Sequence, residues 1–155
     1  MAVGDTRTVP DQPPTVVAIH VAKGRRLPMQ TKERVDVEAG KGIVGDRYHG
    51  TKHRHVSIQS RETLDQAAEA FGSAVPSDLT RRNLTLSHGD IPKEPGTHLR
   101  IGDVLLEVVR VAAPCKLLDD TIGIGAQEAL RRRGGSIFRV LEGGTISVGD
   151  RVLRG

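Results

Sequence analysis

The chain has 155 residues, of which 37% are hydrophobic and only 2% aromatic, and its formal net charge is +4. This length and apolar content suffice for one well-packed core but not for two, so we expect a single domain over residues 15–155. The scarcity of aromatic side chains argues against nucleic-acid binding, because single strands are held by stacking on aromatic rings. The positive charge instead favours a small anionic ligand, such as a phosphorylated one.

Residues 1–14 carry charges and prolines and contain no continuous apolar stretch. They predict a disordered tail rather than a signal peptide. No later segment approaches the roughly 20 apolar residues that a membrane-spanning helix requires. The single cysteine, Cys115, cannot form an internal disulfide and suits a reducing compartment. We therefore expect a cytoplasmic protein that does not span a membrane.

The first half of the chain predicts two strands and one helix. Residues 15–21 are rich in β-branched side chains and follow two prolines, which favours a first strand. Residues 54–58 form a second extended segment. Ser60 then caps a helix that ends at Gly72. The apolar face of this helix is formed by Leu64, Ala67, Ala68 and Phe71.

Three glycine-aspartate pairs predict turns. Each follows a β-branched residue, in Val44-Gly45-Asp46, Ile101-Gly102-Asp103 and Val148-Gly149-Asp150. The second and third lie between alternating apolar runs and are typical of hairpin connections. The first differs, because the polar residues Arg47, Tyr48 and His49 follow its aspartate.

Short strands dominate the middle of the chain. Residues 83–87 alternate between apolar and polar side chains and predict a half-buried strand. Residues 98–101 predict the next strand. A longer apolar run over residues 104–112 then leads directly to Pro114-Cys115, so the lone thiol follows the end of a strand.

The last third of the chain predicts one helix and a hairpin. Residues 125–135 favour a short helix with Arg131–Arg133 in its last turn, where cations complement the helix dipole. Residues 136–142 and 145–153 predict two strands joined across Gly143-Gly144. Many short strands with few short helices indicate a mainly β protein, and a closed or half-closed barrel is the simplest arrangement of them.

Cys115 is the main candidate for chemistry. An unpaired cysteine can react as a thiolate, bind a metal or simply pack in the core, and the residues alone leave all three open. A zinc site formed by Cys115 with His49, His53 and His55 is one alternative, since thiolate and imidazole are common zinc ligands. His53 and His55 would share one face of a strand, but no second cysteine completes a closed tetrahedral site.

Several motifs in order resemble those of the MOSC domain, named after the C-terminal domain of molybdenum cofactor sulfurases. The motifs are Gly42-Ile43-Val44-Gly45-Asp46-Arg47-Tyr48-His49, Arg81-Arg82-Asn83-Leu84, Gly102-Asp103, Pro114-Cys115 and Gly143-Gly144-Thr145-Ile146-Ser147-Val148-Gly149-Asp150. Each motif alone is weak, but five in the same order are specific. The resemblance extends over residues 16–153. It implies a MOSC-type β-barrel with a few short peripheral helices.

The resemblance also implies a molybdopterin-type molybdenum cofactor. Cys115 occupies the position of the family's cysteine, which is either a molybdenum ligand or a sulfur carrier. Arg81 matches an arginine that anchors the cofactor's phosphate or the oxygens on molybdenum, and a guanidinium fork suits such anions. Asn83 matches the family's asparagine and shapes the start of its strand. Arg82 is expected to face solvent.

Four further residues belong to the predicted site. Lys23 resembles a lysine that approaches the cofactor phosphate, and Arg47 is placed with the cofactor-binding residues. Asp46 is expected to orient Arg47 or His49. His49 is a candidate proton donor near a bound oxo group, and either His49 or Asp46 is expected to assist proton delivery in catalysis.

Two functions of different classes follow from this resemblance. The first is a small molybdenum-dependent reductase of N-hydroxylated or N-oxidised compounds, which requires an external electron donor because the sequence has neither a Rossmann glycine motif nor an iron-sulfur cysteine set. The second is a carrier that accepts either sulfur or cofactor and hands it to a partner protein. In the sulfur case, a donor protein would supply the sulfur and Cys115 would carry it as a transient persulfide. The chain has no PLP-dependent desulfurase domain, so it is not a complete sulfurase by itself.

Overall fold

The computed structural model describes residues 12–114 and 117–154, and these residues are arranged mainly as β-strands. The predicted class, mainly β with a few short helices, is confirmed. The helices are α1 (Arg61–Phe71), α2 (Leu117–Thr121) and α3 (Ala126–Ala129). The strands are β1 (Val16–Val21), β2 (Gln30–Lys32), β3 (Arg34–Glu38), β4 (Gly42–Ile43), β5 (Val56–Ser60), β6 (Leu84–Leu86), β7 (His98–Ile101), β8 (Val104–Val111), β9 (Ser136–Glu142), β10 (Gly144–Ser147) and β11 (Val152–Arg154).

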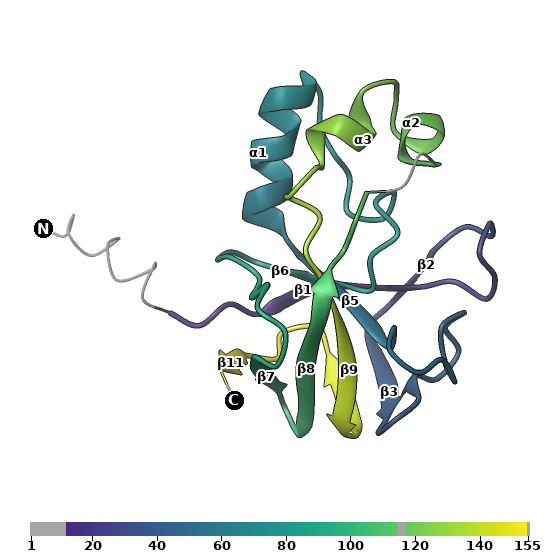
Figure 1. Cartoon of the computed structure of the whole chain (residues 1–155), viewed down its shortest axis with the longest axis vertical. Coiled ribbons are helices and arrows are strands. Elements are labelled where there is room, and N and C mark those ends of the chain that lie inside the picture. Colours follow the sequence, from purple (N-terminus) through teal and green to yellow (C-terminus); the bar gives the residue numbers. More distant parts are fainter. Residues whose placement is uncertain (1–11, 115–116, 155) are drawn as a thin grey trace, which may run out of the picture.

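The strands form a large sheet and a small one (Figure 1). The large sheet has the order β11-β7-β8-β9-β5-β6-β1-β2, and the small sheet has the order β10-β3-β4. Within the large sheet only β5 and β6 run parallel. A single isolated bridge, between Thr15 and Arg151, links the starts of β1 and β11. No continuous ladder among the described strands closes the sheet into a ring, so a closed barrel is not confirmed.

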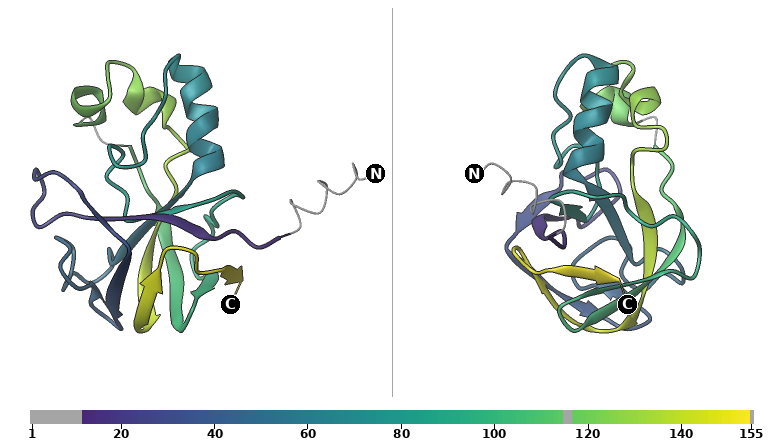
Figure 2. Two further views of the ribbon diagram at one scale, coloured as in Figure 1. Left: turned by 180° about the vertical axis from the view of Figure 1, so that it is seen from behind. Right: turned by 90° about the vertical axis from the view of Figure 1, so that its left-hand side faces the viewer.

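The apolar core lies between the sheets, and the helices gather at one end of the molecule (Figures 1 and 2). In β5, Val56 and Ile58 point into the core, whereas Ser57 and Gln59 point to the opposite face. The helices form a second apolar cluster, made of Leu64, Ala67, Val75, Leu118, Ala126 and Leu130. Among the described residues, no helix combines the length and apolar character needed to cross a membrane.

Helix α1 begins and ends as the sequence predicts. The Ser60 side chain accepts a hydrogen bond from the Glu62 backbone N–H at 3.2 Å, which satisfies one of the free donors at the helix start. Gly72 ends the helix in the left-handed conformation, with φ 89°, and its N–H donates to Ala68 O. Strand β5 begins at Val56, two residues later than predicted.

The predicted C-terminal hairpin is wrong. Strand β9 pairs with β8 and β5, whereas β10 pairs with β3. Gly143 does not form a hairpin turn. It allows the chain to pass close to the backbone of β3, since a Cβ atom on Gly143 would lie 2.6 Å from Val37 O. The turn at Gly149 also joins strands that do not pair with each other, because β11 pairs with β7. Only the turn at Gly102 makes the predicted hairpin, between β7 and β8.

The predicted helix over residues 125–135 is wrong in length. Helix α3 ends at Ala129, so the arginine triplet lies beyond it rather than in its last turn. Arg132 adopts a left-handed φ of 65°, which is incompatible with continuing the helix. Arg133 Nη1 still donates to Ala129 O at 2.9 Å and so satisfies a carbonyl at the helix end.

Candidate functional site

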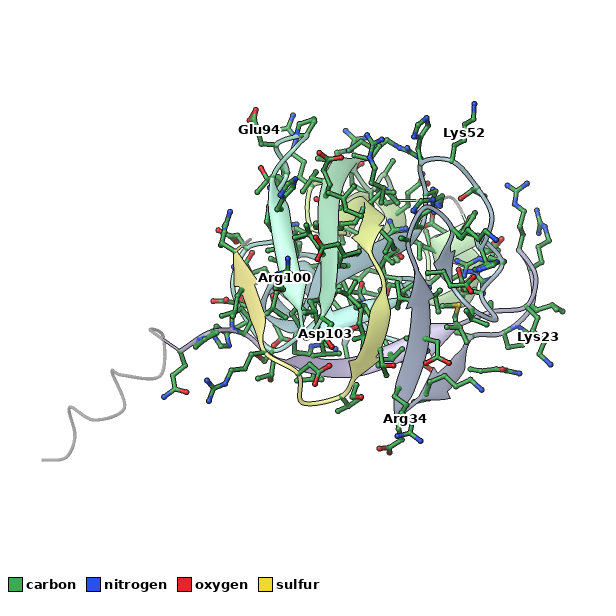
Figure 3. All side chains as sticks on the ribbon, turned by 90° about the horizontal axis from the view of Figure 1, so that it is seen from below. Lys23, Arg34, Lys52, Glu94, Arg100 and Asp103 are labelled. Carbon is green, nitrogen blue, oxygen red and sulfur yellow. The ribbon has the colours of Figure 1, made fainter. Side chains whose placement is uncertain are left out.

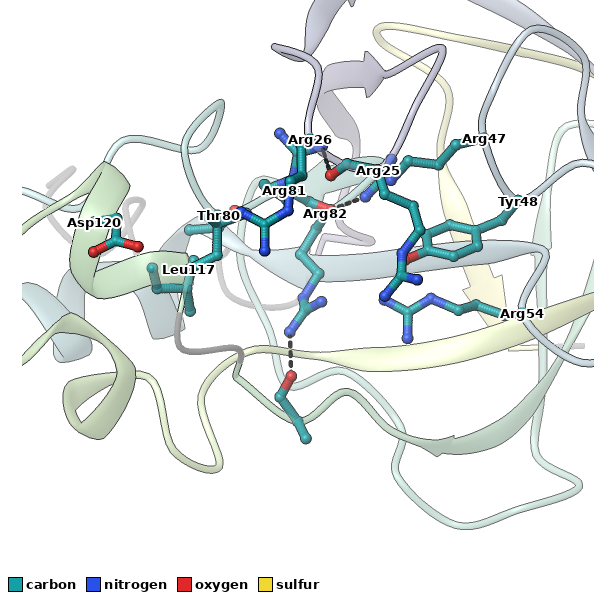
Figure 4. A pocket seen from close by; sticks show the side chains of 12 residues that line it. Arg25, Arg26, Arg47, Tyr48, Arg54, Thr80, Arg81, Arg82, Leu117 and Asp120 are labelled. Carbon is teal, nitrogen blue, oxygen red and sulfur yellow. Dashed lines mark hydrogen bonds between the residues drawn. The ribbon is translucent and has the colours of Figure 1, made fainter.

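A cavity of about 610 Å³ lies where four parts of the chain meet (Figure 4). These are the loop between β1 and β2, the loop between β4 and β5, the segment before β6, and helix α2 with Ala113 in the segment that follows β8. Its volume is within the range of small-molecule sites. The lining residues are Arg25, Arg26, Arg47, Tyr48, Arg54, Thr80, Arg81, Arg82, Ala113, Leu117, Leu118 and Asp120. Half of them are arginines, which is the composition expected of an anion-binding site.

Asp46 lies in the wall behind the cavity and fixes Arg47. Its side chain is fully buried and accepts hydrogen bonds from Arg47 Nη1 at 3.1 Å, Ala22 N–H at 3.1 Å and Tyr48 N–H at 3.2 Å. The preceding turn needs Gly45, which has φ 92°. Arg47 Nη2 in turn donates to Arg81 O at 3.2 Å. Asp46 was predicted to orient either Arg47 or His49. Its carboxylate binds the side chain of Arg47, whereas the side chain of His49 contacts Glu38 instead.

Tyr48 carries two cations on its ring. The guanidinium carbons of Arg47 and Arg54 lie 4.6 Å and 4.3 Å from the ring centroid. Arg54 Nε is buried and has no hydrogen-bond partner in the described part of the chain. Burial lowers the pKa of Arg54 below its usual value, and the nearby cations Arg110 and Arg47 act in the same direction. An anionic ligand would give this guanidinium both a hydrogen-bond acceptor and a counter-charge.

Arg81 connects two of the loops that line the cavity. Its Nη2 donates to Arg25 O at 2.8 Å, and Gly24 O lies 3.5 Å away (Figure 4). Its backbone has φ 65°, a conformation that costs a non-glycine residue about 1 kcal/mol or more. Strain of this kind persists where the surrounding structure imposes it, which is common at binding sites.

Arg82 is buried, and the prediction that it faces solvent is wrong. The residue is 5% exposed, its Nε donates to Gly134 O at 3.0 Å, and its Nη2 donates to Ala113 O at 3.1 Å. Neighbouring residues of an extended chain normally point to opposite faces, which is why one arginine was expected outside. The left-handed conformation of Arg81 breaks this alternation, and both side chains line the cavity. Nothing in the sequence pattern indicates this turn.

Asn83 directly precedes β6 and is not among the residues that line the cavity. Its Oδ1 accepts from Ser57 N–H at 3.0 Å and its Nδ2 donates to His20 O at 3.1 Å, so the side chain joins β5, β6 and β1. The amide is 2% exposed. Asn83 therefore holds the start of β6 against its neighbouring strands and does not line the cavity.

His49 and Lys23 lie outside the cavity lining. His49 Nε2 lies 2.6 Å from Glu38 Oε1, on the exposed side of the loop between β4 and β5. Lys23 is exposed and directly precedes Gly24, the residue whose carbonyl approaches Arg81. The structure thus brings Arg47 and Arg81 together at the cavity, with Asp46 behind them and with Asn83, His49 and Lys23 outside its lining.

The histidines do not form a metal site in the described residues. His55 Nδ1 accepts from Val140 N–H at 3.0 Å, so its Nε2 carries the proton and donates to Thr51 O at 2.7 Å. Both ring nitrogens are therefore occupied, and burial lowers the pKa of His55. Among the described residues, no group of three histidine, cysteine, aspartate or glutamate side chains could hold a metal ion. The zinc alternative gains no support from these residues.

Cys115, predicted as the molybdenum ligand or sulfur carrier, lies outside the described residues. Its nearest lining residues along the chain are Ala113 and Leu117, each two positions away. Ala113 is held by Arg82, as described above.

Comparisons with known proteins give one family and one fold. The family model of the MOSC domain matches residues 45–153. The YuaD protein from Bacillus subtilis has a similar structure, with a TM-score of 0.80 and 16% identity over 90% of this chain and 93% of that one. YiiM from Geobacillus stearothermophilus has a TM-score of 0.71 and 19% identity, over 92% of this chain and 75% of that one. YiiM from Escherichia coli has a TM-score of 0.69 and 17% identity, over 92% and 69%. No curated protein matches the sequence significantly.

Proposed function

Because this chain belongs to the MOSC domain family, we propose that it binds a molybdopterin-type molybdenum cofactor in the arginine-lined cavity. The main support is the convergence of six arginines on one cavity of about 610 Å³. Such a cofactor carries a phosphate and metal-bound oxygens, and guanidinium groups bind both kinds of oxygen through paired N–H donors.

The side chains at the cavity fit an anionic group of this kind. Arg54 has a buried Nε without a hydrogen-bond partner among the described residues, so it is a donor in need of an acceptor. Arg25 and Arg26 are exposed at the same cavity. We assign the binding of the cofactor's anionic groups to these three arginines with Arg81. Lys23 would approach the phosphate from outside the cavity.

Other residues of the site act by holding the binding groups in place. Asp46 neutralises Arg47 and fixes its direction, which leaves Arg47 Nη2 to hold the Arg81 carbonyl. Arg82 holds the Ala113 carbonyl, two residues before Cys115. Cys115 is assigned as the molybdenum ligand from its place in the family motif, because thiolates are soft ligands for such metals.

We propose that the protein reduces N-hydroxylated or N-oxidised compounds with electrons from an external donor. When bound, the cofactor supplies oxygen-atom transfer coupled to a two-electron change at the metal. The chain would supply the concave, cationic site that retains the cofactor. A sulfur carrier requires an accessible cysteine but no such cavity, so the cavity favours the enzyme over the carrier.

The test is to produce the full chain in a host that makes the cofactor, and to measure bound molybdenum and pterin fluorescence. We expect the parent to retain both. R54Q should lower both, because it removes a cavity cation whose buried Nε has no hydrogen-bond partner among the described residues. R34Q is the matched control, since Arg34 is exposed on β3 and does not line the cavity, and it should retain both at the parent level.

Absence of molybdenum and pterin from the parent, under conditions that load a known molybdenum enzyme, would refute cofactor binding. C115S should lose molybdenum while it keeps part of the pterin. Retention of molybdenum by C115S would leave the cofactor in place but remove Cys115 as its ligand. Sulfane sulfur on the parent's Cys115 without any cofactor would favour the carrier function.

A further inference from the structure

The charges of the chain are divided very unevenly. Residues 16–32, 47–61 and 79–89 together carry ten lysines and arginines and no aspartate or glutamate. The whole chain has 23 basic and 19 acidic residues, so the rest of it is acidic overall. A net charge of +4 therefore understates how basic these three stretches are.

The three acid-free stretches meet at the cavity. Each contributes lining residues, and hydrogen bonds join all three. Arg47 N–H donates to Ala22 O at 2.7 Å, and Arg47 Nη2 donates to Arg81 O at 3.2 Å. Arg81 Nη2 completes the connection with Arg25 O at 2.8 Å. All six lining arginines come from these stretches, so the uneven distribution along the sequence becomes a basic face around the cavity, where Asp120 is the one acidic lining residue among those described.

Three exposed cations extend this face beyond the cavity. Lys23, Lys52 and Arg110 do not line the cavity and form what we name the cationic rim. Lys23 and Lys52 project from the same side of the molecule in Figure 3. Arg110, at the end of β8, is close enough to Arg54 to affect its pKa. A small ligand inside the cavity would not reach these three exposed side chains, whereas a larger partner over the mouth of the cavity would contact them.

We infer that the cationic rim docks an acidic surface of a partner protein over the mouth of the cavity. This inference rests on the proposed function, because such a partner would be the donor that reaches the cavity with electrons. Complementary charge at the edge of an interface accelerates association and fixes orientation. Single-stranded nucleic acid fits less well, since Tyr48 is the only aromatic residue lining the cavity and two guanidinium groups already lie on its ring.

The test uses a dye-labelled polyglutamate peptide as the acidic probe and measures its binding to the full chain by fluorescence anisotropy. The double variant K52E/R110E reverses two charges of the rim. We expect it to weaken peptide binding at low ionic strength by about tenfold and to reduce the dependence of binding on salt. The control R34E/K93E makes the same change in net charge at two exposed sites outside the three stretches, and should change binding by less than about twofold.

Equal weakening by both double variants would overturn the inference, because binding would then reflect net charge alone. Tighter binding of a DNA duplex of equal charge, lost in K52E/R110E only, would also overturn it in favour of nucleic acid. Molybdenum and pterin content is measured in the same samples. A parent without cofactor refutes the proposed function, whereas a rim variant that binds the peptide as the parent does refutes the docking surface.

Discussion

Two arginine runs, Arg81-Arg82 and Arg131–Arg133, are alike in the sequence and different in the structure. The first lies one residue before β6, a strand between β5 and β1 in the large sheet, and both its side chains line the cavity. The second lies after a four-residue helix, where Arg131 pairs with Glu128 at 3.4 Å in solvent and Arg133 binds the carbonyl of Ala129.

The difference shows that the element next to a charged run decides its role. Arg82 is anchored by carbonyls from the end of β8 and from the segment before β9, and it therefore joins parts of the chain that are distant in sequence. The side chains of Arg131 and Arg133 contact residues three and four positions away, and the one longer contact of this run among the described residues, from Thr63 Oγ1, goes to the backbone carbonyl of Arg133. The side chain of Arg82 therefore holds together segments that are distant in the sequence, whereas the side chains of the second run only join neighbouring residues of one segment.

The largest effect expected from this comparison is on the free energy of unfolding. Arg82→Met keeps much of the aliphatic volume but removes both charged hydrogen bonds, and should lower stability by about 2–3 kcal/mol. Arg132→Met is the control from the second run, because Arg132 is exposed, and should change stability by less than about 0.5 kcal/mol. Urea unfolding of both variants measures the difference. Equal losses would show that burial does not distinguish the two runs.

Local signals in the sequence predict a large part of the fold. The caps of α1, the strand predicted over residues 83–87 and the turn at Gly102 depend on residues close together in the chain, and all three are present. The strand spans residues 84–86 and is fully buried, not half-buried as predicted. The partner of β10 depends on a contact with β3 more than a hundred positions away, and the glycine pair before it looks like a hairpin turn from sequence alone. Strand β2 was not predicted, because its three residues are polar and exposed. Strand β3 was also missed, although Val35 and Val37 alternate with polar residues and are buried, so its signal was present in the sequence.

The candidate site was predicted only in outline. The resemblance to the MOSC domain identified Arg47 and Arg81, which the structure places at the cavity. It did not identify Arg54, whose importance comes from its contact with Tyr48 and its unpartnered Nε. Arg25 and Arg26 were also missed, since their loop reaches the cavity through the hydrogen bond to Arg81. Such contacts between loops leave no periodic signal in the sequence.

A smaller effect is expected on the pH dependence of stability, where a buried and an exposed histidine can be compared in the way that the two arginine runs are. Burial lowers the pKa of His55, so the unfolded chain binds a proton more readily than the folded one. The contribution of neutral His55 to the free energy of unfolding is therefore fully present above about pH 6.5, the pKa in the unfolded chain. It is lost as the pH falls from there through the pKa in the folded protein. The loss amounts to about 1.4 kcal/mol for each unit by which folding lowers the pKa. Urea unfolding at pH 7.5 and pH 5.5 measures it.

His55→Asn should reduce this loss of stability at acid pH. His20 contributes in the same direction, because burial also lowers its pKa, so part of the loss should remain. His49→Asn is the matched control, since His49 lies on the exposed side of its loop and its side chain contacts Glu38. An unchanged pH dependence in His55→Asn would show that His55 is not the buried group responsible.

The smallest effect is expected within the second arginine run. Arg131 and Glu128 form an ion pair with both side chains about two-thirds or more exposed, and such pairs contribute about 0–1 kcal/mol because water and salt screen them. Arg131→Met should therefore change the free energy of unfolding by less than about 0.5 kcal/mol, and added salt should remove the difference. Arg133→Met should cost slightly more, because it also releases the Ala129 carbonyl at the end of α3. A larger and salt-independent loss in Arg131→Met would mean that the run has a buried partner, and the distinction between the two runs would then fail.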